Sequence, residues 1–201
     1  MLSLLTLLLF AVLFYVVYII IASAFEEVGF KSWEAGIIVF SCIIFRWVNL
    51  PIIKYGKWII AINVGGALIP ILISIYLMIS RKVAGRSIIG MVIVAYFAYN
   101  VTHVTKAGVV ATFPYWLIPP IAASMYSILV AIKNKKKAAS TAYSSGTIGV
   151  LIGADLLHLK ELLQIEAKNV TVASIGGAAI FDMIFLTGII AVLIDAILYK
   201  K

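Results

Sequence analysis

The residues best placed to do chemistry in this chain are two aspartates, each preceded by the same short pattern. Thr147-Ile148-Gly149 precedes Asp155, and Ser174-Ile175-Gly176 precedes Asp182, with the same spacing in both copies. Both copies lie in apolar stretches long enough to cross a membrane. A carboxylate there costs about 2.5–3.5 kcal/mol on insertion scales and is usually functional. The repeat therefore predicts where a site lies, but not what it binds.

Two carboxylates in one pocket with little water cannot easily both ionise, so one of them must hold a proton unless a cation lies between them. That property suits proton or monovalent-cation exchange, and it also suits a general acid and base acting on a bound water. We predict an ion or substrate site built from side chains that the spacing can bring together. Its candidate residues are Asp155, Asp182, His158, Asn63, Thr147 and Ser174.

In the sixth apolar segment, Thr147, Leu151, Asp155 and His158 are spaced to stack on one helix face. This spacing predicts a hydrogen-bonded, proton-exchanging pair of Asp155 and His158. A second stripe contains Gly149 and Gly153 and lets another backbone approach closely. The alternative is that these glycines only pack and that Asp155 caps the helix or reaches the interface.

In the seventh segment, Gly176 and Gly177 precede Asp182 by about a turn and a half, and adjacent glycines weaken a helix by roughly 1 kcal/mol each. We expect 171–177 to be non-helical and a half-helix to begin near Gly177, which would bring Asp182 to the depth of Asp155. With an unbroken helix the two carboxylates would not meet.

Other segments also carry residues that break helices. In the third, Asn63 and Pro70 flank a Gly-Gly pair, which predicts a bent helix with Asn63 facing the same cavity. Pro114, Pro119 and Pro120 predict a break in mid-span of the fifth. Asp195 lies close to the terminal lysines, and we expect it at the membrane interface.

The composition indicates the medium that positions these residues. Of the 201 residues, 64% are hydrophobic and 12% charged, and the mean hydropathy is +1.16, whereas a soluble domain is about half apolar. We predict an all-α integral membrane protein, a polytopic bundle of six to seven transmembrane helices, some broken at Gly or Pro, forming a single domain over 1–201. The apolar segments are 1–24, 35–53, 57–79, 87–101, 109–132, 139–158 and 171–198, of which 35–53 is the weakest span.

The net charge of +8 comes from basic residues clustered between apolar segments, which indicates membrane topology rather than nucleic-acid binding. The positive-inside rule predicts a multi-pass protein of the cell membrane with loops 81–86 and 133–137 and the C-terminus in the cytoplasm. One cysteine and two histidines leave no disulfide framework and no zinc constellation, so we expect no metal and no cofactor. The expected partners are the lipid bilayer and a monovalent cation or proton. Self-association into a homo-oligomer stays open.

Three stretches resemble a prokaryotic membrane family known as domain of unknown function 1614. They are Asn63-Val-Gly-Gly-Ala-Leu-Ile-Pro70, Gly146-Thr-Ile-Gly-Val-Leu-Ile-Gly-Ala-Asp155-Leu and Ala173-Ser-Ile-Gly-Gly-Ala-Ala-Ile-Phe-Asp182-Met-Ile-Phe-Leu-Thr-Gly188. The resemblance covers most of the chain from about residue 60 onward. It implies a bacterial or archaeal cell membrane and directs attention to Asn63, Asp155 and Asp182, but it supplies no substrate.

These observations favour a small ion- or proton-coupled transporter, because broken helices and paired acids are typical of carriers. Two alternatives stay open. Phe181-Asp182 is similar to half of the motif of presenilin-like intramembrane aspartyl proteases, although Gly153-Ala154-Asp155 matches the other half only in part and the order is reversed. A non-catalytic membrane scaffold would use the aspartates for helix association. Whether the chain is an enzyme is therefore undecided by the sequence.

Overall fold

The computed structural model describes residues 4–105, 108–131, 134–167 and 169–199, and it is mainly helical. The α-helices are α1 (Leu4–Val28), α2 (Ser32–Ile44), α3 (Ile69–Ser80), α4 (Ala84–Val101), α5 (Ile118–Val130), α6 (Lys135–Val150), α7 (Leu159–Gln164) and α8 (Met183–Leu198). The strands are β1 (Asn49–Tyr55), β2 (Trp58–Asn63), β3 (Thr102–Thr105), β4 (Gly108–Ala111) and β5 (Thr171–Ile175). Short 3-10 turns are η1 (Phe45–Trp47), η3 (Tyr115–Leu117) and η5 (Ala179–Phe181), and π-helical segments are η2 (Val64–Leu68) and η4 (Leu151–Leu156).

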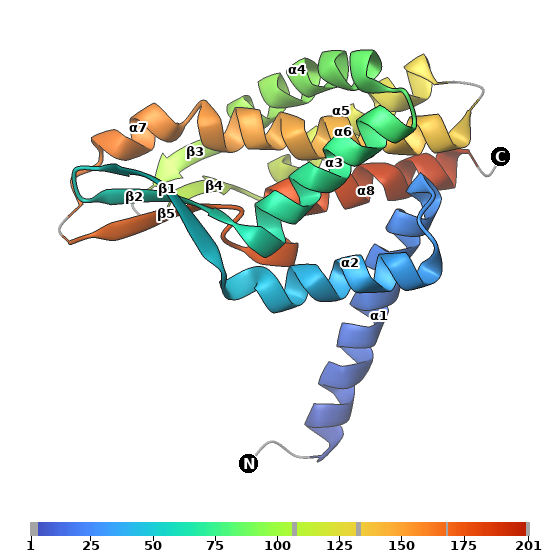
Figure 1. Cartoon of the computed structure of the whole chain (residues 1–201), viewed down its shortest axis with the longest axis horizontal. Helices are drawn as coiled ribbons and strands as arrows, with labels where there is room; N and C mark the ends of the chain where they lie inside the picture. Colours follow the sequence, from blue (N-terminus) through green and yellow to red (C-terminus); the bar gives the residue numbers. More distant parts are fainter. Residues whose placement is uncertain (1–3, 106–107, 132–133, 168, 200–201) are drawn as a thin grey trace.

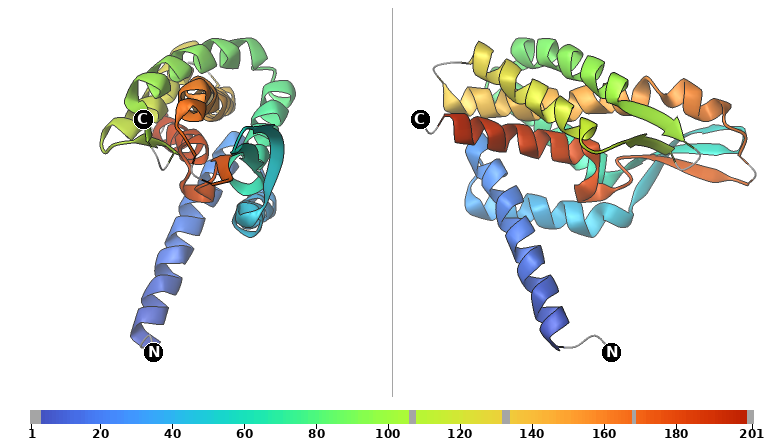
Figure 2. Two further views of the ribbon diagram at one scale, coloured as in Figure 1. Left: turned by 90° about the vertical axis from the view of Figure 1, so that its left-hand side faces the viewer. Right: turned by 180° about the vertical axis from the view of Figure 1, so that it is seen from behind.

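Helix α6 lies at the centre of the bundle, with α3, α4, α5 and α8 packed around it (Figures 1 and 2). Every residue from Ala138 to Thr147 is buried, although most of them are small or carry a hydroxyl group. Small side chains let neighbouring backbones approach closely. Helices associate through such close packing when their surroundings are as apolar as their own side chains. The polarity of α6 thus fits its central place, since the outer helices separate it from the surroundings.

One end of the bundle carries the strands (Figure 1). In the first sheet β2 is central, antiparallel to β1 and parallel to β5, with Trp58 opposite Thr171 and Ile62 opposite Ile175. The second sheet is the β3–β4 hairpin. Helix α7 lies at the same end of the bundle, and its Leu162 is buried. We call this the sheet end of the bundle.

Four of the predicted spans begin or end as strands, and 35–53 and 57–79 are the first two along the chain. The segment 35–53 is helical in α2 and then continues as β1, an exposed edge strand. Pro51 has no backbone N–H to donate to a neighbouring strand, and an edge strand tolerates this. The segment 57–79 begins as β2, passes through η2 and becomes helical in α3, so the bend expected in this segment is a change from strand to helix. Both strands are mostly apolar, which is why length and hydropathy alone did not separate them from helices.

The fifth predicted span also differs. It starts with β4 and becomes helical only at α5, where Pro119 and Pro120 occupy the first turn. Proline is well accepted there because the first backbone N–H groups of a helix have no partner within the helix. The expectation that these prolines break a helix in mid-span is therefore wrong.

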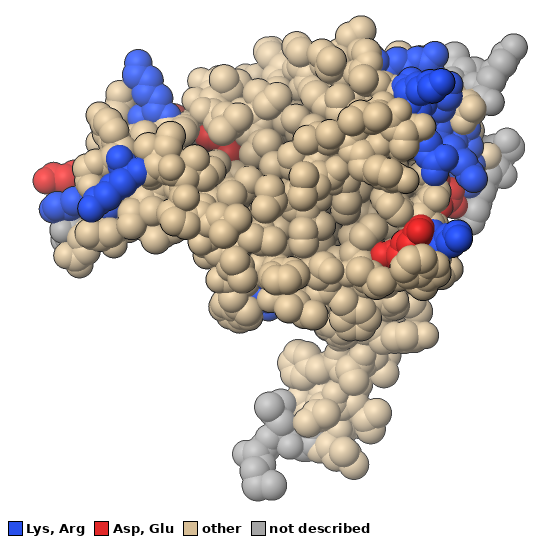
Figure 3. All heavy atoms as spheres, viewed as in Figure 1, with Lys and Arg blue, Asp and Glu red and all other residues tan. Residues whose placement is uncertain are grey.

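Helices α1 and α4 are long and apolar enough to cross a membrane. The stretches Val64–Ser80, Tyr115–Val130 and Met183–Leu198 are apolar helical regions of 10–17 residues. The expected six to seven spans are thus not reproduced at full length in the part of the chain that the structure describes. The N-terminal part of α1 projects from the bundle and is exposed (Figure 1). In Figure 3, charged side chains gather at the two ends of the bundle, with a nearly uncharged surface between them.

Candidate functional site

Asp155 lies in η4, where the helix continuing from α6 widens into a π segment. This segment packs tightly on α4. A Cβ on Gly153 would collide with the carbonyl oxygen of Ala95, and one on Gly149 would lie 2.6 Å from the Cβ of Val94. The glycine stripe predicted from the sequence is therefore the contact between this helix and α4. Because a π segment holds more residues per turn, it changes the face on which the following side chains lie.

Asp182 is the N-cap of α8. Its Oδ1 accepts a hydrogen bond from the backbone N–H of Ile184 at 3.0 Å, and its Oδ2 accepts one from Ala178 at 3.3 Å. The chain reaches this position through β5 and a turn in which Gly176 has φ +75°, a conformation that favours glycine. A Cβ on Gly176 would also lie 2.5 Å from the Cβ of Ala67 in η2. The predicted break before Asp182 is thus present, and the helix begins at Met183.

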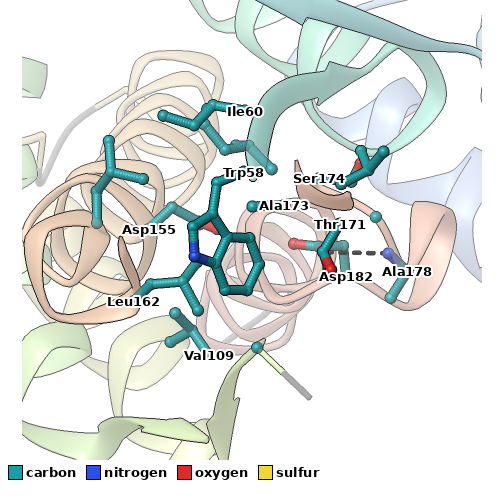
Figure 4. Close-up of a pocket in the computed structure, with 15 residues that line it drawn as sticks. Trp58, Ile60, Val109, Asp155, Leu162, Thr171, Ala173, Ser174, Ala178 and Asp182 are labelled. Carbon is teal, nitrogen blue, oxygen red and sulfur yellow. Dashed lines mark hydrogen bonds between the residues drawn. The ribbon is translucent and has the colours of Figure 1, made fainter. Parts of the chain in front are cut away.

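The two breaks bring Asp155 and Asp182 to one pocket of about 390 Å³ at the sheet end (Figure 4). Its walls come from β2, β5, α7 and β4, including the Trp58 ring, Ser174 and Val109. An adjoining pocket of about 360 Å³, with Trp116 and Phe181 in its wall, is lined by the same two aspartates. The carboxylates therefore lie on the boundary between two cavities.

The two carboxylates are close enough to interact electrostatically, and both are half-buried. Among the described residues, no lysine or arginine lines either pocket. Asp182 is held by two backbone N–H groups, whereas no described group donates a hydrogen bond to Asp155. The pocket therefore combines one fixed carboxylate with one whose oxygens are available to a ligand.

Comparison with known proteins places the chain in a family. The family model described as "Protein of unknown function (DUF1614)" matches residues 16–194, which include every candidate site residue. The chain belongs to the DUF1614 family. No curated protein and no solved structure matches it. The resemblance noted from the sequence motifs is thereby confirmed.

In this DUF1614 chain, Ser174 lies in the wall of the aspartate pocket but is tied to a neighbouring segment. Its Oγ donates a hydrogen bond of 2.5 Å to Oδ1 of Asn49. The same Asn49 oxygen accepts one from Nδ2 of Asn63 at 3.1 Å. Asn49 was not singled out from the sequence, although a polar residue at the start of an apolar strand is a signal for such a role.

Asn63 is fully buried and does not line the pocket. Its Oδ1 accepts a hydrogen bond from the N–H of Gly66, and its Nδ2 also donates to the carbonyl of Arg46 at 2.7 Å. Asn63 therefore caps η2 and joins it to η1. The expectation that it faces the cavity is wrong, because its hydrogen-bonding groups are used by the backbone. Pro70 lies buried in the first turn of α3.

His158 does not pair with Asp155. Its Nδ1 lies 3.2 Å from Oε2 of Glu161, its Nε2 lies 3.2 Å from the carbonyl oxygen of Tyr99, and its ring stacks on the Tyr99 ring. The predicted pair fails because η4 shifts the helical phase between the two residues. His158 instead joins α7 to the end of α4.

Thr147 is also separated from the pocket, since it lies in the contact between α6 and α8 beside Gly188. Gly177 lines the aspartate pocket. Among the described residues, no group of three or more histidines, cysteines, aspartates or glutamates could hold a metal ion. The polar side chains that line the aspartate pocket include the two carboxylates and the hydroxyl groups of Thr171 and Ser174.

Asp195, which was expected at the membrane interface, is a buried carboxylate near the C-terminal end of α8. It is 1% exposed and is hydrogen-bonded by Ser124 and Ser127 of α5. The serines are three residues apart, a spacing that indicates one helix face but does not reveal its partner. The lysines expected beside it, Lys200 and Lys201, and Lys133 of the predicted basic loop lie outside the described residues.

Proposed function

We propose that this DUF1614 protein is a multi-pass protein of the cell membrane. The apolar lengths of α1 and α4 support this, as does the nearly uncharged band in Figure 3. The helical run 135–156 is about 33 Å long at ~1.5 Å per residue, close to the ~30 Å of a bilayer core. The basic residues of 81–86 and 133–137 lie on the cytoplasmic side, and the sheet end faces outward.

Within that membrane, the function that the geometry supports best is that of a small proton- or cation-coupled transporter. The observation that carries this proposal is that Asp155, from a π segment, and Asp182, from the N-terminus of α8, line one pocket. Helix breaks at membrane depth are tolerated where they line a cavity, and carriers use them to bind ions.

The two carboxylates have different roles in this proposal. Asp182 is the better stabilised anion of the two, because two backbone N–H groups donate hydrogen bonds to its oxygens. Asp155 has no such donors, so a single proton or monovalent cation binds between the two and relieves their repulsion. When that ion leaves, the two carboxylates repel each other again. The release of the ion is thereby coupled to a change in the distance between the two sides of the pocket.

Proteoliposomes containing the full chain and an internal pH dye test this proposal. An imposed membrane potential should drive proton uptake, and a sodium gradient applied separately shows whether sodium replaces the proton. Asp155→Asn and Asp182→Asn should each reduce the flux to that of protein-free liposomes. Glu166→Gln, which changes an exposed carboxylate outside the pocket, should leave it unchanged. Wild-type flux in both aspartate variants would overturn the proposal.

A second function is favoured by one observation. All residues of the edge strand β5 line the aspartate pocket, so an extended peptide that pairs with β5 would lie beside both carboxylates. An intramembrane aspartyl hydrolase would use this arrangement to attack a peptide bond with a bound water. Cleavage of an extended apolar peptide by the wild type, lost in both Asn variants, would favour the hydrolase over the transporter. If both Asn variants were stable and neither activity appeared in the wild type, the scaffold hypothesis would be favoured instead.

A further inference from the structure

The aspartate pocket is far larger than a proton or a single metal ion requires. Its volume is about 390 Å³, and the adjoining pocket adds about 360 Å³ beside the same two carboxylates. Cavities of about 300–1,000 Å³ are typical of sites for small organic molecules. The size of the site therefore indicates an organic ligand in addition to the coupled ion.

The charge of the pocket selects the sign of that ligand. Asp155 and Asp182 both line it, and no lysine or arginine does so in the described part of the chain. An anion would meet two carboxylates without a compensating positive charge, whereas a cation would relieve their mutual repulsion. The charges therefore favour a cationic ligand.

Apart from the two carboxyl groups, the polar side chains described in the pocket wall donate their hydrogens within the protein. The Trp58 Nε1–H donates to the carbonyl oxygen of Ile165 at 3.1 Å. The Thr171 hydroxyl donates to the carbonyl oxygen of Asn169 at 2.9 Å. A carbonyl oxygen can only accept, and each donor has a single hydrogen, so neither has one left for a ligand.

The Ser174 hydroxyl is fixed in the same way by its neighbours. Oδ1 of Asn63 accepts a hydrogen bond from the N–H of Gly66, so the other end of this amide is the donor Nδ2. That Nδ2 lies 3.1 Å from Asn49, which must therefore present its oxygen. Ser174 Oγ lies 2.5 Å from the same oxygen and donates to it. The side chains of the wall thus leave acceptors for a ligand, and the ligand must supply the hydrogens.

Aromatic and apolar side chains form the rest of the wall. Figure 4 shows the Trp58 ring among the lining side chains, with Asp155 and Asp182 on either side of it in this view. The face of an aromatic ring attracts a cation, and that of tryptophan does so most strongly. Leu162 and Val109 line the same pocket and offer contacts to a hydrocarbon group.

We infer that the substrate of the aspartate pocket is a small hydrophobic organic cation whose head group carries N–H donors, an ammonium or guanidinium ion. Its head group donates hydrogen bonds to Asp155, and its hydrocarbon part packs against Trp58 and Leu162. Protonation of Asp155 removes the charge that binds the cation, so one proton leaves as one cation binds. This inference rests on the proposed function and deepens it, because it names the substrate class that is exchanged for the proton.

Isothermal titration calorimetry of the full chain in detergent tests the ligand class. The probes are phenethylguanidinium and phenethylurea, which have the same shape, but only the first is charged. Phenethylguanidinium should bind saturably, and its affinity should fall at least about tenfold in Asp155→Asn, because a charge-assisted hydrogen bond is lost. Glu166→Gln, which changes an exposed carboxylate outside the pocket, should bind like the wild type. Equal binding of the two probes, or no saturable binding of the cation, would overturn the inference.

Two variants of Trp58 test the aromatic contact. Trp58→Phe and Trp58→Leu both lose the hydrogen bond to Ile165, so they differ from each other mainly in the presence of a ring. Trp58→Phe should retain most of the affinity for phenethylguanidinium, whereas Trp58→Leu should weaken it about threefold to tenfold. Equal affinities in the two variants would overturn the role given to the ring.

The exchange with a proton is tested by the pH dependence of binding. A guanidinium ion stays charged throughout the range from about pH 8 to about pH 5. As Asp155 takes up its proton, the affinity for phenethylguanidinium should fall by up to about tenfold per pH unit. An affinity that does not change with pH would overturn the exchange.

Proteoliposomes with an internal pH dye separate this inference from the proposed function. Phenethylguanidinium added outside should raise the internal pH as the cation enters and a proton leaves, and phenethylurea should not. Proton flux that ignores phenethylguanidinium would overturn the inference and leave the proposed function intact. Binding of phenethylguanidinium without any flux of protons or cations would contradict the proposed function and the exchange, and would support the ligand class alone.

Discussion

At the sheet end, Asp155 and Asp182 border open pockets, while at the opposite end Asp195 is closed off between α5 and α8. In the first pair, Asp155 lies in a π segment and Asp182 caps α8, and Asp155 has no hydrogen-bond donor among the described residues. Asp195 lies in a continuous helix, and both of its oxygens are hydrogen-bonded. The comparison suggests that a carboxylate is satisfied where neighbouring helices or a helix N-terminus supply its donors, as at Asp195 and Asp182, and stays available to a ligand where a pocket takes their place, as at Asp155.

The largest effect is expected from removing the enclosed carboxylate. Asp195→Ala removes the acceptor of the Ser124 hydroxyl and one of the two acceptors of the Ser127 hydroxyl in a closed contact, and it should lower the free energy of unfolding by about 2–4 kcal/mol. Asp155→Ala should change it by no more than about 0.5 kcal/mol, because that side chain borders a pocket and its loss removes a repulsion. Thermal unfolding in detergent measures both. Equal losses would remove the distinction between the two ends.

A smaller effect is expected at the turn that creates the break before Asp182. Gly176→Ala should cost about 2–3 kcal/mol, because it combines a left-handed conformation with overpacking against Ala67. Gly56 has φ +58° but open space around it, so Gly56→Ala should cost only about 1–2 kcal/mol. The difference in unfolding midpoint between the variants isolates the packing contribution. If both variants had the same midpoint, the turn would not depend on contact with η2.

The smallest effect is expected from a serine in the pocket wall. Ser174→Ala loses the hydrogen bond to Asn49 and should cost about 0.5–1.5 kcal/mol, since solvent in the pocket replaces part of the bond. Ser124→Ala, which removes a donor from the buried Asp195, should cost about 1–3 kcal/mol. Denaturant titrations of the two variants compare these losses. A larger loss for Ser174→Ala would show that the sheet end is the more rigid one.

Part of the site follows from local sequence. The pattern before Asp182 combines β-branched residues with two glycines, and the extended segment was predicted from it, whereas the helix begins at Met183 rather than near Gly177. The glycines before Asp155 predicted a close helix contact, because only small residues permit one. The pairing of Asp155 with His158 failed, because helical spacing alone cannot show that a π segment intervenes.

The sequence by itself determined the mainly helical character, the family, and the break in the backbone that precedes Asp182. These depend on hydropathy, side-chain branching and glycine content, which act within a few residues. Only the tertiary structure decided that β5 pairs with β2, that Asn63 caps η2 and that Asp195 meets two serines of α5. Such contacts join residues far apart in the chain, and their partners depend on how the whole bundle packs.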